Sequence, residues 1–273
     1  MHEYCFNFLF WSNEDLPRGD DFWMFVEGLS LFPGRKVMYT VFDVDAPSNQ
    51  IMRLKKHDLG NEIRAKQNAP PDVILCGGFD PVDRQPENVL SFIADPSSVW
   101  LGDGTLPRVE AIISKTVMDS YDNGYFSTVL ETVLEFIGRS NAVWGFVDLF
   151  PTQMSQQGRA FSSIHYSDVA PLMLTRQAIW LARSRKGISL SGIHWGNFLG
   201  NELLEKIGGR RWFLDEAQRV LTLPNGKLYG ILRELESGVF FAICPSPEEF
   251  TSDPTVCYPL KWFAELLVDH DLI

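Results

Sequence analysis

The order of apolar patterns after residue 107 constrains the fold of this chain more than any other feature. Patterns with the two-residue period of a strand alternate there with patterns of the 3.6-residue period of a helix. Such a mixture predicts an α+β fold, in which helices pack on a largely antiparallel sheet. In chain order we expect a strand over 108–118, a helix over 124–137, a strand over 142–150, helices over 171–183 and 195–207, a hairpin of 228–234 with 239–244, and a helix over 260–268.

The first 107 residues give weaker signals. Aromatic and β-branched residues indicate buried strands, but prolines interrupt almost every run between residues 46 and 110. The expected elements are strands over 4–11 and 36–44, a helix over 20–31, and short strands near 73–76 and 89–93. The strand–helix–strand order at the beginning allows two similar halves, 1–107 and 108–273, within a single domain.

Composition limits the classes of partner. The chain has 273 residues, of which 45% are hydrophobic and 22% charged, and this composition is typical of a globular protein with a substantial core. The net charge of −11 argues against direct binding of nucleic acid, which requires a basic patch. It favours a soluble protein that meets a basic partner, although ordinary cytosolic proteins are often acidic as well.

The compartment follows from what the sequence lacks. The first residues carry Glu3 and no basic run, so they make a poor signal peptide, and no apolar run approaches the roughly 18 residues that cross a bilayer. The four cysteines are scattered, with no C-x-x-C pair, so they suggest neither a zinc site nor a disulfide framework. We therefore expect a cytoplasmic protein that contacts no membrane and carries no cofactor.

The segment GIHWGNFLGNELLEKIGGRRWF at 192–213 raises the question of catalysis. His194 precedes the apolar stripe of the helix expected over 195–207, and Gly208 and Gly209 are best explained as its C-cap. The five histidines are isolated, without an H-E-x-x-H motif, and there is no G-x-S-x-G nucleophile motif. The sequence therefore predicts a packing role for this segment and no enzymatic activity.

An alternative function rests on Asp43 and Asp45. The stretch Phe42-Asp43-Val44-Asp45 is an apolar strand that ends in D-x-D, a pattern with which sugar transferases hold a divalent ion against a nucleotide diphosphate. The competing interpretation is that Asp43 caps the turn through Asp45-Ala46-Pro47. A glycine-rich phosphate loop, which would support the metal-dependent nucleotide-sugar transferase, is absent from the sequence.

Acidic residues beside aromatic ones predict a surface for protein docking. The loop at 12–21, between Trp11 and Trp23, contains four acids against the single base Arg18. From Glu234 to the end there are eight acids against Lys261. When the partner is basic, aromatic anchor residues contribute affinity, and acidic residues at the rim of the contact increase the rate of association. The candidate contact residues are Glu14, Asp15, Asp20 and Asp21, with Asp43 and Asp45 as neighbours, and Glu248 and Glu249 near the C-terminus.

Three stretches carry a resemblance: SGIHWGNFLGNELLEKIGG, GILRELESGVFFAICPSPEEF and YPLKWFAELL. They resemble the type VI secretion immunity proteins, a family formerly known only as a domain of unknown function. WGFVDLFP at 144–151 fits an upstream feature of that family, and the resemblance covers mainly 108–270. The chain departs from the pattern after Pro245, where it has Ser246-Pro247-Glu248-Glu249 in place of Gly-Asp. The matching residues are Trp195, Phe198, Leu199, Leu203, Gly208, Gly209, Gly238, Val239, Pro247 and Tyr258.

The resemblance implies a non-enzymatic antitoxin that binds and blocks an antibacterial effector delivered into its own cell. An inhibitor in the cytoplasm is useful against a toxin that acts there, such as a nuclease. Because a nuclease presents a basic groove to phosphates, an acidic inhibitor could occupy that groove. The expected partner is thus a cognate secreted toxin, with a basic nuclease domain as the hypothesis drawn from charge.

Overall fold

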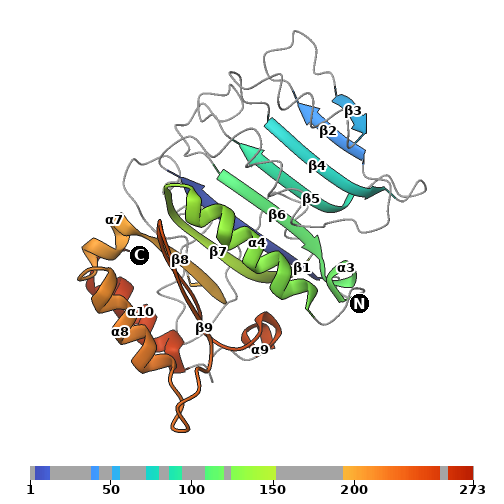
Figure 1. Ribbon diagram of the computed structural model, residues 1–273. Coiled ribbons are helices and arrows are strands. Elements are labelled where there is room, and N and C mark those ends of the chain that lie inside the picture. Colours follow the sequence, from blue (N-terminus) through green and yellow to red (C-terminus); the bar gives the residue numbers. More distant parts are fainter. Residues whose placement is uncertain are drawn as a thin grey trace.

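The computed structural model describes residues 4–12, 38–42, 51–55, 72–79, 86–93, 108–119, 124–151, 193–252 and 258–272. Its described strands form one ten-stranded sheet in the order β3-β2-β4-β5-β6-β1-β7-β8-β10-β9, and every neighbouring pair is antiparallel (Figure 1). The predicted α+β class with a largely antiparallel sheet is confirmed. The strands are β1 (Tyr4–Ser12), β2 (Met38–Phe42), β3 (Ile51–Lys55), β4 (Asp72–Phe79), β5 (Pro86–Ile93), β6 (Arg108–Ser114), β7 (Ala142–Pro151), β8 (Gly196–Gly200), β9 (Ile231–Leu235) and β10 (Gly238–Ala242).

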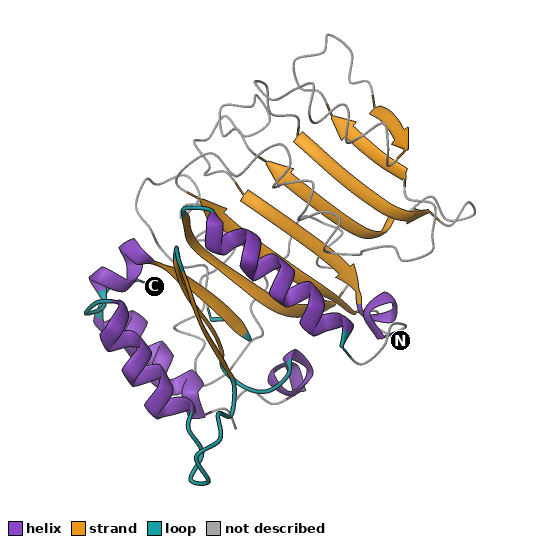
Figure 2. Ribbon diagram, viewed as in Figure 1, coloured by secondary structure: helices purple, strands orange, loops and turns teal. Residues whose placement is uncertain are grey.

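Helices lie on both faces of the part of the sheet formed by β1, β7, β8, β10 and β9. Figure 2 shows α4 on one face and the pair α8 and α10 on the other. On one side, Phe126 of α4 packs against Phe6 of β1, with ring centroids 5.0 Å apart. On the other side, Phe241 of β10 meets Phe213 of α8 at 5.5 Å and Phe263 of α10 at 4.5 Å. The helices of the described residues are α3 (Lys115–Asp119), α4 (Tyr125–Arg139), α7 (Asn201–Lys206), α8 (Arg210–Leu221), α9 (Pro247–Ser252) and α10 (Tyr258–Asp269).

Strand β10 explains why a continuous apolar run forms a strand here. Adjacent residues of a strand point to opposite faces of the sheet. Phe240 therefore faces Trp195, at 6.4 Å between centroids, while Phe241 faces α8 and α10. All five residues of β10 are buried, so both faces require apolar side chains. The hairpin prediction is confirmed, with its turn at Glu236-Ser237.

The expected helix over 195–207 is wrong in its first half. Gly196–Gly200 form β8, which lies between β7 and β10, and only Asn201–Lys206 form the helix α7. All residues of β8 are buried. A short strand that is buried on both faces shows no polar alternation, so its apolar residues also fit a helical period.

The interpretation of the twin glycines is confirmed, although the helix that they end is shorter. Gly208 and Gly209 have φ of 109° and 96°, and the Gly209 N–H donates to the Leu204 carbonyl at 2.8 Å. This six-to-one bond is the Schellman arrangement that satisfies a free carbonyl at a helix end. The helix α8 begins directly afterwards at Arg210 and was not expected from the sequence.

Other boundaries differ modestly. The strand expected over 108–118 ends at Ser114, because the next five residues form α3. Strand β3 was not expected, and the helices predicted over 20–31 and 171–183 lie outside the described residues. Strand β1 pairs with both β6 and β7, so residues on either side of position 107 share one sheet. Within the described ranges, the helices are too short or too polar to cross a membrane.

Candidate functional site

His194 lies in the core, two residues before the start of β8. Its Nδ1 is 3.0 Å from Oδ2 of Asp148 on β7, and the two side chains are 4% and 3% exposed. The imidazole stacks on Phe146, with centroids 3.7 Å apart and planes 12° from parallel. Asn197 fixes the same segment, since its Nδ2 donates to the His194 carbonyl at 2.7 Å and its Oδ1 accepts from the His194 N–H at 3.1 Å. These contacts hold the chain that enters β8 against β7.

Trp195 belongs to the same packed unit. The side chain is fully buried, and its Nε1–H donates to the Cys244 carbonyl at 2.9 Å. The Trp195 carbonyl accepts from the N–H of Ile243 at 2.9 Å, so the segments before β8 and after β10 are joined. The contacts of His194 and Trp195 are those of core residues that position β8. Asp148 was missed at the sequence level, although a single carboxylate in the apolar strand WGFVDLFP requires a buried partner.

The structure places two of the predicted contact residues. Glu248 and Glu249 are in the first turn of α9, where Glu248 is 3.1 Å from Lys115 of α3 and Glu249 accepts a hydrogen bond from the Tyr229 hydroxyl. Ser246 caps the helix, since its Oγ accepts from the Glu249 N–H at 3.2 Å. Both acids thus have partners within the chain. The other predicted contact residues, Glu14, Asp15, Asp20, Asp21, Asp43 and Asp45, lie outside the described residues.

Lys115 joins α3 to α9. Its Nζ contacts Asp119 at 2.8 Å as well as Glu248 at 3.1 Å. Burial lowers the pKa of Lys115, but the hydrogen bonds to these two carboxylates and their negative charge outweigh burial and raise the pKa above its ordinary value of 10.5. The described residues contain no cluster of three side chains suited to bind a metal. Asp43 and Asp45 lie outside these residues.

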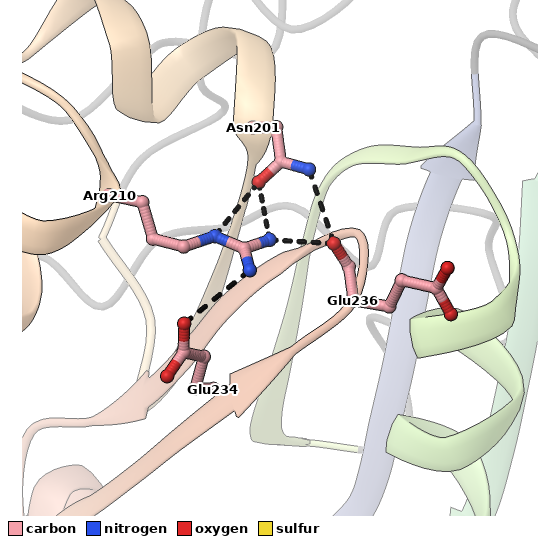
Figure 3. A network of polar contacts seen from close by, with 4 residues as sticks. All are labelled: Asn201, Arg210, Glu234 and Glu236. Carbon is pink, nitrogen blue, oxygen red and sulfur yellow. Dashed lines mark hydrogen bonds and ion pairs between the residues drawn. The ribbon is translucent and has the colours of Figure 1, made fainter.

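A polar network around Arg210 fixes the β9–β10 hairpin (Figure 3). The Arg210 guanidinium donates to Oδ1 of Asn201 through Nε at 3.1 Å and Nη2 at 2.5 Å, and Nη2 also donates to the Glu236 carbonyl at 2.6 Å. Asn201 donates from Nδ2 to the same carbonyl at 3.2 Å and from its N–H to the Ser237 carbonyl at 3.0 Å. The Ser237 Oγ in turn donates to the Ile137 carbonyl of α4 at 2.9 Å.

This network connects four elements at the end of the sheet. The turn of the hairpin, the start of α7, the start of α8 and the end of α4 all contribute a partner. The planar guanidinium supplies several donors at fixed angles, so one side chain can bond to both the turn carbonyl and Asn201. The sequence signal was the pair Arg210-Arg211 directly after two glycines, but the sequence does not show that Arg210 reaches a turn 26 residues away.

Two ion pairs extend from the hairpin to the helices. Nη2 of Arg233 on β9 is 3.1 Å from Oε1 of Glu131 on α4, and Nη1 of Arg210 is 3.5 Å from Oε1 of Glu234 on β9. Because Arg233 and Glu234 are adjacent on the strand, they project to opposite faces. The two charges of β9 are therefore paired on both sides of the sheet. We take the β9–β10 hairpin with these flanking residues as the candidate functional site.

Comparison with solved structures finds a likeness in fold. The chain is similar to the Pseudomonas aeruginosa T6SS protein PA0821, with a TM-score of 0.58 and 12% sequence identity, over 88% of this chain and 65% of that one. The chain thus spans slightly less than two thirds of the length of that protein. No family model matches the sequence. No curated protein matches it either. At this identity the likeness shows a shared fold.

Proposed function

We propose that this chain is an immunity protein associated with a type VI secretion system, which binds an antibacterial effector and blocks it. The observation that carries the proposal is the fold shared with a type VI secretion protein over most of this chain. The family-like residues give independent support, because those within the described ranges from Trp195 to Val239 gather in β8, α7, the glycine cap and β10. We infer that they preserve a scaffold, while the exposed side chains of β9 and the acidic segments differ with the partner.

The mode of action that we propose is stoichiometric and non-enzymatic. The side chains of His194 and Asp148 are almost completely buried and serve β7 and β8, which supports an inhibitor that acts by occupying a surface. The net charge of −11 favours a basic target. A cytoplasmic nuclease fits this requirement, because its groove for phosphates is basic.

The test uses the product of the gene beside the one that encodes this chain, since an immunity protein is expected to be encoded next to its toxin. Expression of that product alone should stop growth of a sensitive bacterium, and co-expression of this chain should restore it. Calorimetry with the two purified proteins should give a 1:1 complex. A toxic neighbour that this chain neither binds nor neutralises would overturn the proposal.

The finer proposal of a nuclease target needs its own measurement. The neighbouring product should degrade DNA or RNA, and addition of one equivalent of this chain should stop degradation. In a separate titration, divalent metal should not bind this chain more tightly than it binds the Asp43→Asn variant. Tight metal binding that depends on Asp43 would instead support the transferase alternative.

A further inference from the structure

Strand β9 is the last strand of the described sheet, and the described residues pair with one side of its backbone only. Its inner side pairs with β10, and no described strand pairs with its outer side. The two-residue turn at Glu236-Ser237 makes Leu235 and Gly238 a hydrogen-bonded pair. Hydrogen-bonded and non-hydrogen-bonded pairs alternate along an antiparallel strand, so Arg233 also bonds to β10. The N–H and C=O groups of Leu232 and Glu234 therefore point outward, away from β10. Neither residue makes a backbone hydrogen bond on that side to any described residue.

The charged side chains that usually obstruct a sheet edge are held away from this one. Proteins commonly protect an edge strand with charges that prevent another strand from adding. Here Arg233 is paired with Glu131 of α4, and Glu234 is paired with Arg210 at the start of α8. One ion pair lies on each face of the sheet, beside the helix that flanks that face. Among the described residues, nothing pairs with the outward backbone groups of Leu232 and Glu234 between these two ion pairs.

The edge is also rigid. Arg210 and Asn201 hold the turn carbonyls, and the Ser237 hydroxyl bonds to α4. Leu235 packs beside Gly138 of α4, where an added Cβ would lie 3.5 Å from the leucine side chain. A preorganised strand loses little conformational entropy when a partner adds to it.

We propose that the outer edge of β9 accepts an extended segment of the effector as an added strand, with main-chain hydrogen bonds to Leu232 and Glu234. This inference rests on the proposed function and names the contact through which it acts. Main-chain pairing supplies affinity in such complexes, and flanking side chains supply specificity. The segment should carry net positive charge, because the chain is strongly acidic and the exposed carboxylate of Glu236 points away from the Arg210 network (Figure 3).

A second copy of this chain fits the edge less well. Each copy would bring a net charge of −11, so association of two copies is opposed by their charge. When identical strands form a continuous antiparallel sheet, the central residue lies opposite its own copy. For β9 this places Arg233 or Glu234 against the same charge in two of the three central registers, and like charges directly opposite destabilise a sheet.

A proline variant isolates the contribution of the main chain. Glu234→Pro removes an outward N–H without removing a bond to β10, and proline is tolerated at such edge positions. Glu234→Ala is the reference, because it loses the same carboxylate but keeps the N–H. We expect Glu234→Pro to bind the purified neighbouring gene product at least about tenfold more weakly than Glu234→Ala, since a hydrogen bond is lost and the proline ring obstructs pairing.

Hydrogen exchange of the wild-type protein provides a measurement without a variant. The amides of Leu232 and Glu234 should exchange more slowly in the complex, while the already paired amide of Arg233 should change less. Equal affinities of the two variants, or unchanged exchange at both outward amides, would overturn the inference. This holds even if the wild-type protein binds the effector and protects cells from it. Failure of the wild-type protein to bind would overturn the proposed function as well. A wild-type dimer that Glu234→Pro dissociates would assign the edge to self-association and overturn the inference.

Discussion

A buried imidazole–carboxylate pair stabilises a protein only while both partners are present. A hydrogen bond of 3.0 Å joins His194 and Asp148, and both side chains are almost completely buried. His194→Ala should therefore lower the free energy of unfolding by roughly 3–5 kcal/mol, because it leaves the Asp148 carboxylate without this partner. Urea denaturation measures the change.

The matched control replaces both members of the pair. His194→Phe combined with Asp148→Leu should be closer to the wild type than His194→Ala, because apolar side chains of similar volume need no hydrogen bond. Folded His194→Ala should still bind the effector, since the residue is buried. A stable, folded His194→Ala protein that has lost protection would show that this residue contributes chemistry.

Trp195 illustrates a second dependence on packing. Its ring is fully buried between Phe126 of α4 and Phe240 of β10, at 5.5 and 6.4 Å between centroids. Trp195→Ala should cost about 3–5 kcal/mol of stability, while Trp195→Phe should cost less because it keeps most of the ring volume. Thermal melts compare the variants. An unchanged melting temperature in Trp195→Ala together with loss of protection would contradict the packing role.

At the scale of elements, the junction between α7 and α8 depends on backbone conformation. Gly209 has φ 96° and ψ 157°, a region that only glycine adopts readily. No atom lies within 4 Å of a Cβ added there, so Gly209→Ala tests strain without a clash. We expect it to lose roughly 1–3 kcal/mol of stability. Gly124→Ala is the control, because φ is −102° there and the position is equally open. Equal denaturation midpoints would contradict the strain.

The contact between α3 and α9 should depend on alkaline pH. The folded-state pKa of Lys115 is raised above 10.5 by Asp119 and Glu248. Its stabilising contribution is therefore fully present below pH 10.5 and is lost as the pH rises through the raised value. As the pH rises from neutral to values above this raised pKa, the free energy of unfolding of the wild type should fall more than that of Lys115→Gln. The same pH dependence in both proteins would contradict a role of Lys115.

Element identity was predictable where one face of an element is polar. The helix α4 was expected from its spacing of apolar residues, and its exposed face carries Glu131 and Glu135. Strand β8 was mistaken for helix because both of its faces are buried, so that only its neighbours β7 and β10 decide its conformation. The start of α8 was missed because the glycine pair was interpreted as an end and not also as the beginning of another helix.

For the whole molecule, the sequence predicted the α+β class and the antiparallel sheet better than it predicted the candidate functional site. Neither the position of β9 at the end of the described sheet nor the pairing of Arg210 with the hairpin turn follows from local patterns, because both depend on contacts between segments far apart. Glu248 was predicted to face a partner, and the structure adds that it is paired with Lys115, so docking there would have to compete with an internal ion pair. That competition makes the acidic segment expected as a loop over 12–21 the stronger candidate for steering. Of this segment only Ser12 is described, as the last residue of β1.

The net charge of −11 should act mainly on the rate of association. Complementary charges outside the buried contact attract a basic partner over a distance limited by salt, whereas affinity depends more on the contacts made after docking. Reversing two acids of the loop, Asp20→Lys with Asp21→Lys, should therefore slow association with the effector and weaken the dependence of that rate on salt. Stopped-flow or surface-binding kinetics at two salt concentrations measure both effects.

The competing explanation for Asp20 and Asp21 is local. Both residues lie at the start of the helix predicted over 20–31, where acids at the N-terminus contribute about 0.5–2 kcal/mol of stability. Thermal melts of the double variant separate this effect from binding, and Asp20→Asn with Asp21→Asn keeps the capacity to cap while removing the charge. If an acid is instead buried against an effector arginine, its loss should speed dissociation and cost roughly 2–5 kcal/mol of affinity. An unchanged association rate in a folded Asp20→Lys, Asp21→Lys protein would move steering away from this loop, and the exposed acids of the β9–β10 hairpin, Glu234 and Glu236, would then be the next pair to reverse.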